Sequence, residues 1–162
     1  MFFWFIGTAI VTVGLVFRDP RFDYRLLIVG SVLPIVDGAF GGARVLHSVV
    51  TSVALLTVLM LATSGRKPIR KALLGLPIGM ILHLVFDGAW NNTEVFWWPV
   101  FGWSFDDAPL PILVRGWWAL AMEAAGIAIC VWLWRHNGLA DTARRARVLR
   151  DGQLDAVPAR FG

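Results

Sequence analysis

Apolar residues in this chain fall into five long segments that are separated by short polar linkers. Each segment approaches the length of about 20 mostly apolar residues that a helix needs to cross the core of a bilayer. Pro34 interrupts the second segment, where packing against partner helices tolerates a kink. The pattern predicts an all-α, polytopic integral membrane protein with five transmembrane helices, over residues 1–17, 22–41, 45–63, 72–90 and 113–134.

The composition agrees with this pattern and limits the number of domains. Of the 162 residues, 57% are hydrophobic and 16% are charged, and the mean hydropathy is +0.67. The length suits one transmembrane domain over 1–135, which carries the candidate site, followed by a basic tail over 136–162. Cys130 is the only cysteine, which excludes an intramolecular disulfide and a cysteine-based zinc site.

Lysine and arginine are distributed unevenly among the linkers. Thirteen of the fifteen lie in the 18–25 linker, in the 66–71 linker and in the tail together with Arg135 just before it, which five spans would place on one side of the membrane. Arg44 and Arg115 belong to the other side. By the positive-inside rule we expect the N-terminus outside and the tail in the cytoplasm of a multi-pass protein of a bacterial inner (plasma) membrane.

The tail and the aromatic residues indicate contact with lipid at both interfaces. A basic stretch over 139–150 has helical character, and we expect it to contact anionic lipid of the inner leaflet. Nucleic acid is not an expected partner, because the chain shows neither a folded reader nor aromatic platforms for bases. Five tryptophans are expected near the outer interface, where indole rings favour the headgroup region: Trp97, Trp98, Trp103, Trp117 and Trp118.

Few ionisable side chains interrupt the apolar segments. Such a group costs at least about 2.5 kcal/mol at mid-span, so each is a functional candidate. Four of them come from three predicted helices and yet lie at a similar depth below the outer interface: Asp37, His47, His83 and Asp87. Glu123 lies near the middle of the fifth predicted helix.

Two imidazoles and two carboxylates at one depth indicate a divalent metal site. Zinc suits these ligands best, and manganese or iron are alternatives. His83 and Asp87 are four residues apart and share one face of a helix, and coordination would compensate charges that are otherwise unpaired. Taken singly, each of the four residues also has a structural interpretation, as an interhelical hydrogen bond or a helix cap.

The remaining polar residues have more than one interpretation. Glu123 is a structural hydrogen-bonding group, an additional ligand or a general base. Arg44 and Arg115 either bind a phosphate group through paired hydrogen bonds or extend from helix ends towards the interface. The loop over 91–112, which contains Trp98, either covers the site or receives acyl chains.

Four stretches, "GSVLPIVDG", "VLHSVV", "HLVFDGAW" and "WWPVFGWSF", resemble the membrane-bound metal-dependent hydrolase family of the LexA-regulated, YdjM-like group. The resemblance covers residues 28–105. It matches Asp37 to the second acid of an "LPDID" stretch and His47 to a "THS"-like histidine. His83 and Asp87 match the pair of an HxxxD helix, and Trp98 with the proline after it matches a "WP" loop.

The chain departs from this family pattern in two places. Ile35 replaces the first acid of "LPDID", and the approach to the "THS" position is reduced to "GGARVL". The resemblance therefore implies a single metal ion. It also implies a phosphoester substrate, since the family resembles zinc-dependent phospholipases in outline.

We therefore expect a metal-dependent hydrolase that acts on a lipid or lipid-linked phosphoester at the extracytoplasmic interface. Asp87 is a metal ligand or the general base, and Glu123 is the other candidate base. Arg44, Arg115 and Trp98 are the expected substrate-binding residues. A non-enzymatic membrane subunit with a structural metal or hydrogen-bond clamp is the alternative, and a small proton-coupled transporter is a weaker one.

Overall fold

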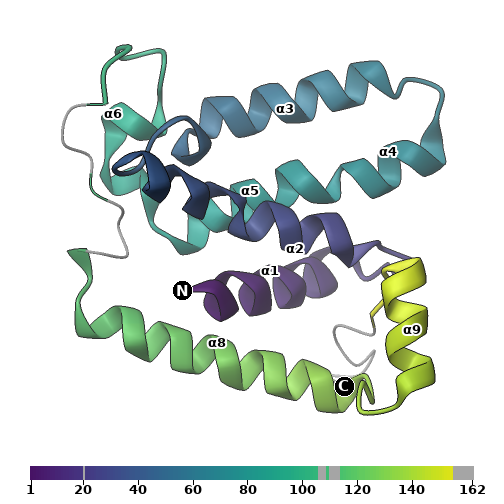
Figure 1. The fold of residues 1–162 in the computed structure, drawn as a ribbon. Coiled ribbons are helices and arrows are strands. Elements are labelled where there is room, and N and C mark those ends of the chain that lie inside the picture. The colour runs from purple at the N-terminus through teal and green to yellow at the C-terminus, as the bar shows by residue number, and fades with distance from the viewer. Residues whose placement is uncertain (20, 106–108, 110–113, 155–162) are drawn as a thin grey trace.

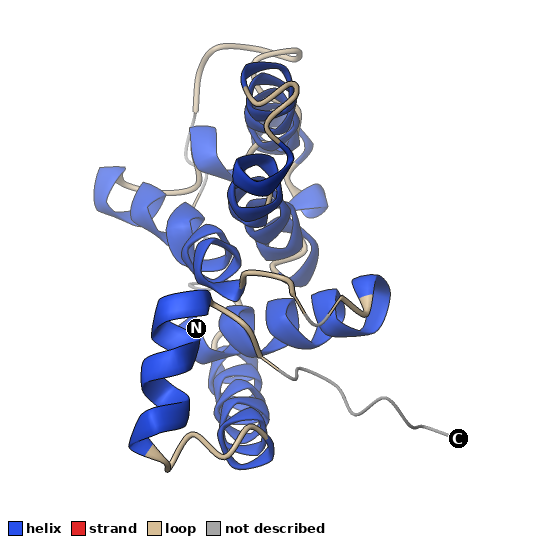
Figure 2. Cartoon of the chain, turned by 90° about the vertical axis from the view of Figure 1, so that its right-hand side faces the viewer, coloured by secondary structure: helices blue, strands red, loops and turns tan. Residues whose placement is uncertain are grey.

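The structure is a computed structural model, and it describes residues 1–19, 21–105, 109 and 114–154. Figure 2 shows helices joined by loops and no strand in this part of the chain. The α-helices are α1 (Phe2–Phe17), α2 (Tyr24–Val32), α3 (Val49–Ala62), α4 (Lys67–Leu73), α5 (Gly75–Phe86), α6 (Thr93–Phe96), α8 (Trp117–His136) and α9 (Thr142–Asp151). The 3-10 helices are η1 (Leu33–Phe40), η2 (Val45–His47) and η3 (Ala89–Asn91). The all-helical class predicted from the sequence is confirmed for these residues.

The second predicted segment is divided where the sequence places its proline. The α-helix α2 ends at Val32, and the chain continues as the 3-10 helix η1, with Pro34 near its start. Proline has no N–H to donate to the preceding turn, and its ring clashes with the carbonyl four residues back. The tighter η1 then carries Asp37, so the division of this segment decides where that carboxylate lies.

The third segment begins with a short turn before its long helix. Ser48 separates η2 from α3, and its hydroxyl accepts hydrogen bonds from the N–H groups of Val50 and Thr51. A serine that accepts from the first N–H groups of a helix is a favoured N-cap. His47 is therefore the last residue of η2 and lies outside the regular helix that follows.

Glycine residues allow α2 and α5 to approach until their backbones touch. A Cβ atom on Gly30 would lie 2.1 Å from the carbonyl oxygen of Leu76, and one on Gly79 would lie 2.3 Å from that of Leu27. Gly75 and Gly79 are four residues apart on α5, and this small-residue spacing is typical of close helix pairs in membranes. The crossing brings the end of α2 against the half of α5 that carries His83.

The second close crossing joins α1 to α8. A Cβ atom on Gly126 would lie 2.2 Å from the backbone nitrogen of Trp4. On the opposite helix, a Cβ atom on Gly7 would lie 3.0 Å from the Cγ2 atom of Ile129. Since α1 also packs on α2 and α5, α8 is held to the bundle chiefly through α1, along the lower edge of Figure 1.

Apolar side chains cover the outside of the bundle. Trp117 and Trp118 of α8 are 85% and 75% exposed, and Leu61 of α3 is 73% exposed. Two stretches of the described chain are long and apolar enough to cross a membrane, Lys67–Phe86 (α4 with α5) and Trp117–His136 (α8), each of 20 residues. These are candidate membrane spans, while α1 and α3 are shorter apolar helices.

The basic segments meet at one end of the bundle. Lys71 of α4 forms an ion pair with Asp19 of the first linker at 2.6 Å. Arg25 of α2 donates to backbone carbonyls at the end of α9, and the N–H of Tyr24 donates to the carbonyl of Gly152 at 2.8 Å. In Figure 1 this end lies on the right, where α9 is seen in the lower part, beside the start of α2 and the end of α8.

We call this the basic end, defined by residues 18–25, 66–71 and 141–152. The opposite end, with η1, η2, α6 and the start of α8, lies on the left of Figure 1 and is called the site end. The three described basic stretches thus share one end of the bundle. The basic helix expected over 139–150 is α9. Arg160 of the tail lies outside the described residues.

Candidate metal centre

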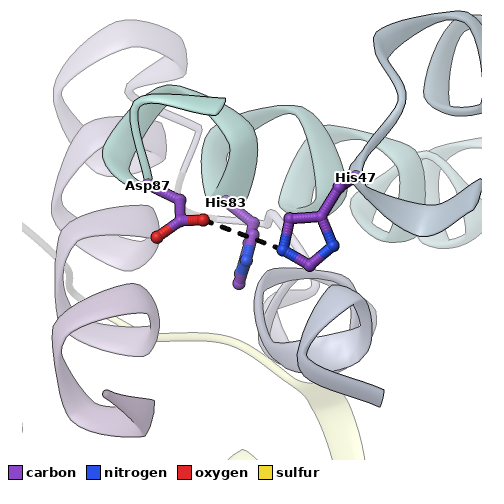
Figure 3. A group of neighbouring side chains, drawn as sticks. All are labelled: His47, His83 and Asp87. Atoms are coloured by element: carbon purple, nitrogen blue, oxygen red, sulfur yellow. Dashed lines mark ion pairs between the residues drawn. The ribbon is translucent and has the colours of Figure 1, made fainter. Parts of the chain in front are cut away.

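Three buried side chains converge at the site end. His83 lies in the last turn of α5, Asp87 follows the end of the same helix, and His47 ends η2. Each offers one nitrogen or oxygen atom such that all three atoms lie within 4.8 Å of one another. Figure 3 shows the two histidine rings and the carboxylate facing a common space, and His47 Nε2 lies 3.7 Å from Asp87 Oδ2. Each of the three residues is only 2% exposed.

The orientation of His83 is fixed by the backbone of α2. Its Nδ1 atom lies 2.7 Å from the carbonyl oxygen of Ser31. A carbonyl oxygen only accepts hydrogen bonds, so Nδ1 carries the proton and Nε2 keeps a free lone pair. The ring of Phe5 packs against the imidazole, with the two centroids 3.9 Å apart. His83 is thus held as a neutral ring in one tautomer, the form that binds a metal ion.

A carboxylate holds His47 in the same way. Asp37 Oδ2 lies 3.0 Å from His47 Nδ1. The same oxygen accepts hydrogen bonds from the backbone N–H groups of Arg44, Leu46 and His47. An oxygen that serves these donors is an acceptor, so the Nδ1 atom of His47 donates and Nε2 is the ring nitrogen left to bind a metal ion. A histidine whose second nitrogen donates to a carboxylate is the common arrangement of metal-ligating histidines.

Asp87 is held by an arginine from the segment before α8. Arg115 Nη1 donates to Asp87 Oδ1 at 2.9 Å, and Nη2 of the same guanidinium donates to the backbone carbonyl of Asp87. The other carboxylate oxygen, Oδ2, is the one that faces His47. The carboxylate is therefore oriented with one oxygen towards Arg115 and the other towards the histidines.

Each of the three converging side chains thus has its own holding partner from a different segment. The α2 carbonyl of Ser31 holds His83, Asp37 of η1 holds His47, and Arg115 holds Asp87. Such outer partners fix the tautomer of histidine ligands and the direction of all three side chains. The group can hold a divalent metal ion, and its two nitrogens and one oxygen are ligands that zinc, manganese and iron accept.

The other predicted site residues lie around this group in different roles. Asp37 lies behind His47 and is not one of the three converging residues. The carboxylate of Glu123 accepts hydrogen bonds from the N–H groups of Phe3 and Trp4, where α1 begins and its backbone donors are otherwise free. Glu123 therefore joins α8 to the start of α1.

Arg44 and Trp98 lie on the same side of the site, next to the His47 segment. The guanidinium of Arg44 lies over the ring of Phe105, 5.6 Å from its centroid. The backbone carbonyl of Trp98 accepts a hydrogen bond from Ser48 Oγ at 2.6 Å. The "WP" loop is thereby fastened to the residue that follows His47.

Sequence reasoning did not identify Ser31, Phe5 or Ser48 as parts of the site. Ser31 acts through its backbone carbonyl, and no side-chain pattern reports which carbonyl a distant histidine will meet. The contact of Phe5 with His83 joins residues from two helices that are far apart in the sequence. Ser48 gives the only usable signal, because serine directly before an apolar helix is a favoured N-cap.

Comparison of the chain with protein-family models, with curated proteins and with solved structures finds no match. The interpretation of the site therefore depends on its own residues and geometry.

Proposed function

We propose that this protein is an integral membrane, metal-dependent hydrolase that acts on a lipid or lipid-linked phosphoester at the outer interface. One observation carries the proposal. His47, His83 and Asp87 each offer one ligand atom, and the three atoms lie within 4.8 Å of one another. Each histidine Nδ1 is committed to a fixed acceptor, which leaves Nε2 as the nitrogen that could bind an ion. Three protein ligands with a further position left for water are typical of catalytic zinc sites, whereas structural sites usually have four.

The residues take distinct roles in this proposal. His47, His83 and Asp87 hold the ion, which would lower the pKa of bound water and polarise a phosphoryl oxygen. Asp37 and Arg115 keep two of these ligands in position. Because the Glu123 carboxylate is engaged with the start of α1, we assign it a structural role in preference to that of a base.

The distribution of apolar, polar and basic residues supports a membrane location and with it a lipid substrate. A buried polar group inside a bundle with an apolar exterior reverses the usual distribution of soluble proteins. The basic segments lie at the opposite end from the site, so the positive-inside rule supports a site towards the outer leaflet. Exposed tryptophans occur at the site end, including Trp103, which is 78% exposed, and such rings favour the headgroup region. Five spans in this orientation belong to the proposal.

Elemental analysis of the purified protein, together with a phospholipid hydrolysis assay, tests the proposal. We expect about one zinc, manganese or iron per chain. His47→Ala, His83→Ala and Asp87→Ala should lose it, while His136→Ala, an exposed histidine at the end of α8, should keep it. Turnover of a phosphoester lipid should disappear with a chelator and in the three site variants. A wild-type protein without stoichiometric metal, or variants that retain it, would overturn the metal site.

A second candidate function is a non-enzymatic membrane subunit whose polar group acts as a structural clamp. It is favoured by the internal partners of His47, His83 and Asp87, which satisfy much of their hydrogen-bonding capacity without an ion. Metal that stays bound without turnover of any phosphoester lipid would support this candidate over the hydrolase.

A further inference from the structure

The two arginines of the site end differ in whether a carboxylate neutralises them. Arg115 is paired with Asp87 at 2.9 Å. Among the residues that the structure describes, Arg44 has no carboxylate partner, and its buried Nε atom has no hydrogen-bond partner. Its guanidinium contacts the face of Phe105 instead. We call His47, His83 and Asp87 together the metal group. Arg44, and not Arg115, is therefore the arginine near this group that has unused hydrogen-bonding capacity.

A second unused donor shares the same aromatic neighbour. The buried indole Nε1 of Trp98 also lacks a hydrogen-bond partner within the described chain. The Trp98 and Phe105 rings are stacked, with centroids 5.4 Å apart and an angle of 27° between their planes. Arg44 and Trp98 thus both contact Phe105, and buried donors without an acceptor are rare enough in native proteins to require an explanation.

Both donors are also fixed to the frame of the metal group. The backbone N–H of Arg44 donates to Asp37 Oδ2, the oxygen that holds His47. The carbonyl of Trp98 accepts from Ser48, the residue after His47. The backbones of the two residues that carry the unused donors are thus both fixed next to the His47 segment.

The charges of the site favour an anion once a metal ion is present. Among the charged side chains that neighbour His47 and His83, the carboxylates of Asp37 and Asp87 balance the guanidinium groups of Arg44 and Arg115. A divalent ion would add two positive charges to this set of four, in a region with little water where electrostatic attraction is strong. An anionic group with several acceptor oxygens would use this charge and offers acceptors of the kind that both unused donors lack.

We propose that Arg44 and Trp98 bind the phosphate group of the substrate, with the guanidinium and the indole N–H as donors and Phe105 as the ring that spaces them. This inference rests on the proposed function and specifies its substrate as an anionic phosphoester. A lipid headgroup and free phosphate both present the phosphate oxyanion, and this is the group that the two donors would bind. Arginine suits this role because its planar fork matches phosphate oxygens.

The test observes the Trp98 indole N–H directly by ¹H–¹⁵N NMR of the metal-loaded protein in detergent. Inorganic phosphate and a short-chain phosphatidylglycerol are titrated in separate arms. We expect a saturable shift of the signal that Trp98→Phe removes, and at least about tenfold weaker binding in Arg44→Met, in line with the strength of charge-assisted hydrogen bonds. Saturation by the lipid alone identifies the headgroup as the ligand, and saturation by both identifies the phosphate group itself.

Matched variants separate this role from a structural one. Arg145 also lies over an aromatic ring, 5.9 Å from the centroid of Trp134, but at the basic end, so Arg145→Met should leave binding unchanged. Trp103→Phe removes an exposed indole next to Trp98 and should also bind normally. All variants should keep the wild-type metal content, which shows that the site is folded.

Absence of a saturable shift, or equal affinity in Arg44→Met and the wild type, would overturn the phosphate site. Either result would leave the evidence from metal content and from lipid turnover as it stands, because these are separate measurements. Loss of the proposed hydrolase would instead appear as absent turnover, even when the Trp98 signal still responds to phosphate. The two proposals therefore fail in different measurements.

Discussion

Replacing Gly79 with alanine should disturb the metal group without touching any of its side chains. A Cβ atom at this position would lie 2.3 Å from the carbonyl oxygen of Leu27 and 2.7 Å from the backbone nitrogen of Ser31. Both are backbone atoms of α2, so no side-chain rotation relieves the clash. Ordinary contact begins at 3.4 Å, and α2 and α5 must therefore separate by roughly 1 Å.

That movement acts on His83 through its hydrogen bond. The Ser31 carbonyl belongs to the part of α2 that moves, so its distance to Nδ1 would rise from 2.7 Å to roughly 3.7 Å, outside hydrogen-bond range. His83 would then lose the partner that fixes its tautomer. Loss of such a partner typically weakens metal binding 10–100-fold, and overpacking costs about 1–3 kcal/mol of stability.

Chelator-competition titration with zinc, on protein checked by circular dichroism, measures the effect. Gly7→Ala is the matched control, because its nearest obstacle is the Cγ2 atom of the Ile129 side chain at 3.0 Å, in the crossing of α1 with α8. We expect that control to keep wild-type zinc affinity. A folded Gly79→Ala protein that binds zinc as tightly as the wild type would refute the link between the glycine crossing and the site.

Three further predictions follow from single contacts. Asp37→Asn should weaken zinc binding about 10–100-fold in the same titration, because an amide can donate to His47 Nδ1 and favour the wrong tautomer; unchanged affinity would contradict this. Ser48→Ala should lower the unfolding free energy by about 1 kcal/mol in thermal denaturation, since α3 loses its N-cap, and an unshifted melting temperature would count against it. The hydrogen bond from Lys71 lowers the pKa of Asp19 below its ordinary value of 3.8, so this contact stabilises the basic end above about pH 3.8 and is lost as the pH falls through the lower, folded pKa. A carboxyl NMR titration should show that Lys71→Ala raises the Asp19 pKa towards its ordinary value, and an unaltered pKa would exclude the Lys71 contact as the main cause.

The apolar pattern predicted the helices well but not their internal breaks. Strong apolar segments became α1, α3, α5 and α8 because burial and lipid both favour a helix that satisfies its own backbone. The second segment changed to a 3-10 helix at its proline, and the chain before α3 formed a separate turn. Pro34 signalled the first of these departures, while the turn at η2 depends on the three backbone N–H groups that converge on Asp37.

The sequence by itself determined which residue types are available near one end of the bundle. The spacing of His83 and Asp87, the position of His47 in the next apolar segment back and the location of the basic linkers are all one-dimensional properties, because helix geometry converts spacing into depth and face. They were sufficient to select the polar residues that the structure places close together.

Only the tertiary structure decided what each residue does there. Asp37 and Asp87 are both carboxylates near a histidine, yet one lies behind His47 and the other faces it. Arg44 and Arg115 carry the same charge, yet only Arg115 meets a carboxylate among the described residues. These assignments depend on hydrogen-bond direction between segments far apart in the chain, and the glycine contacts that bring α2 to α5 set that direction for His83.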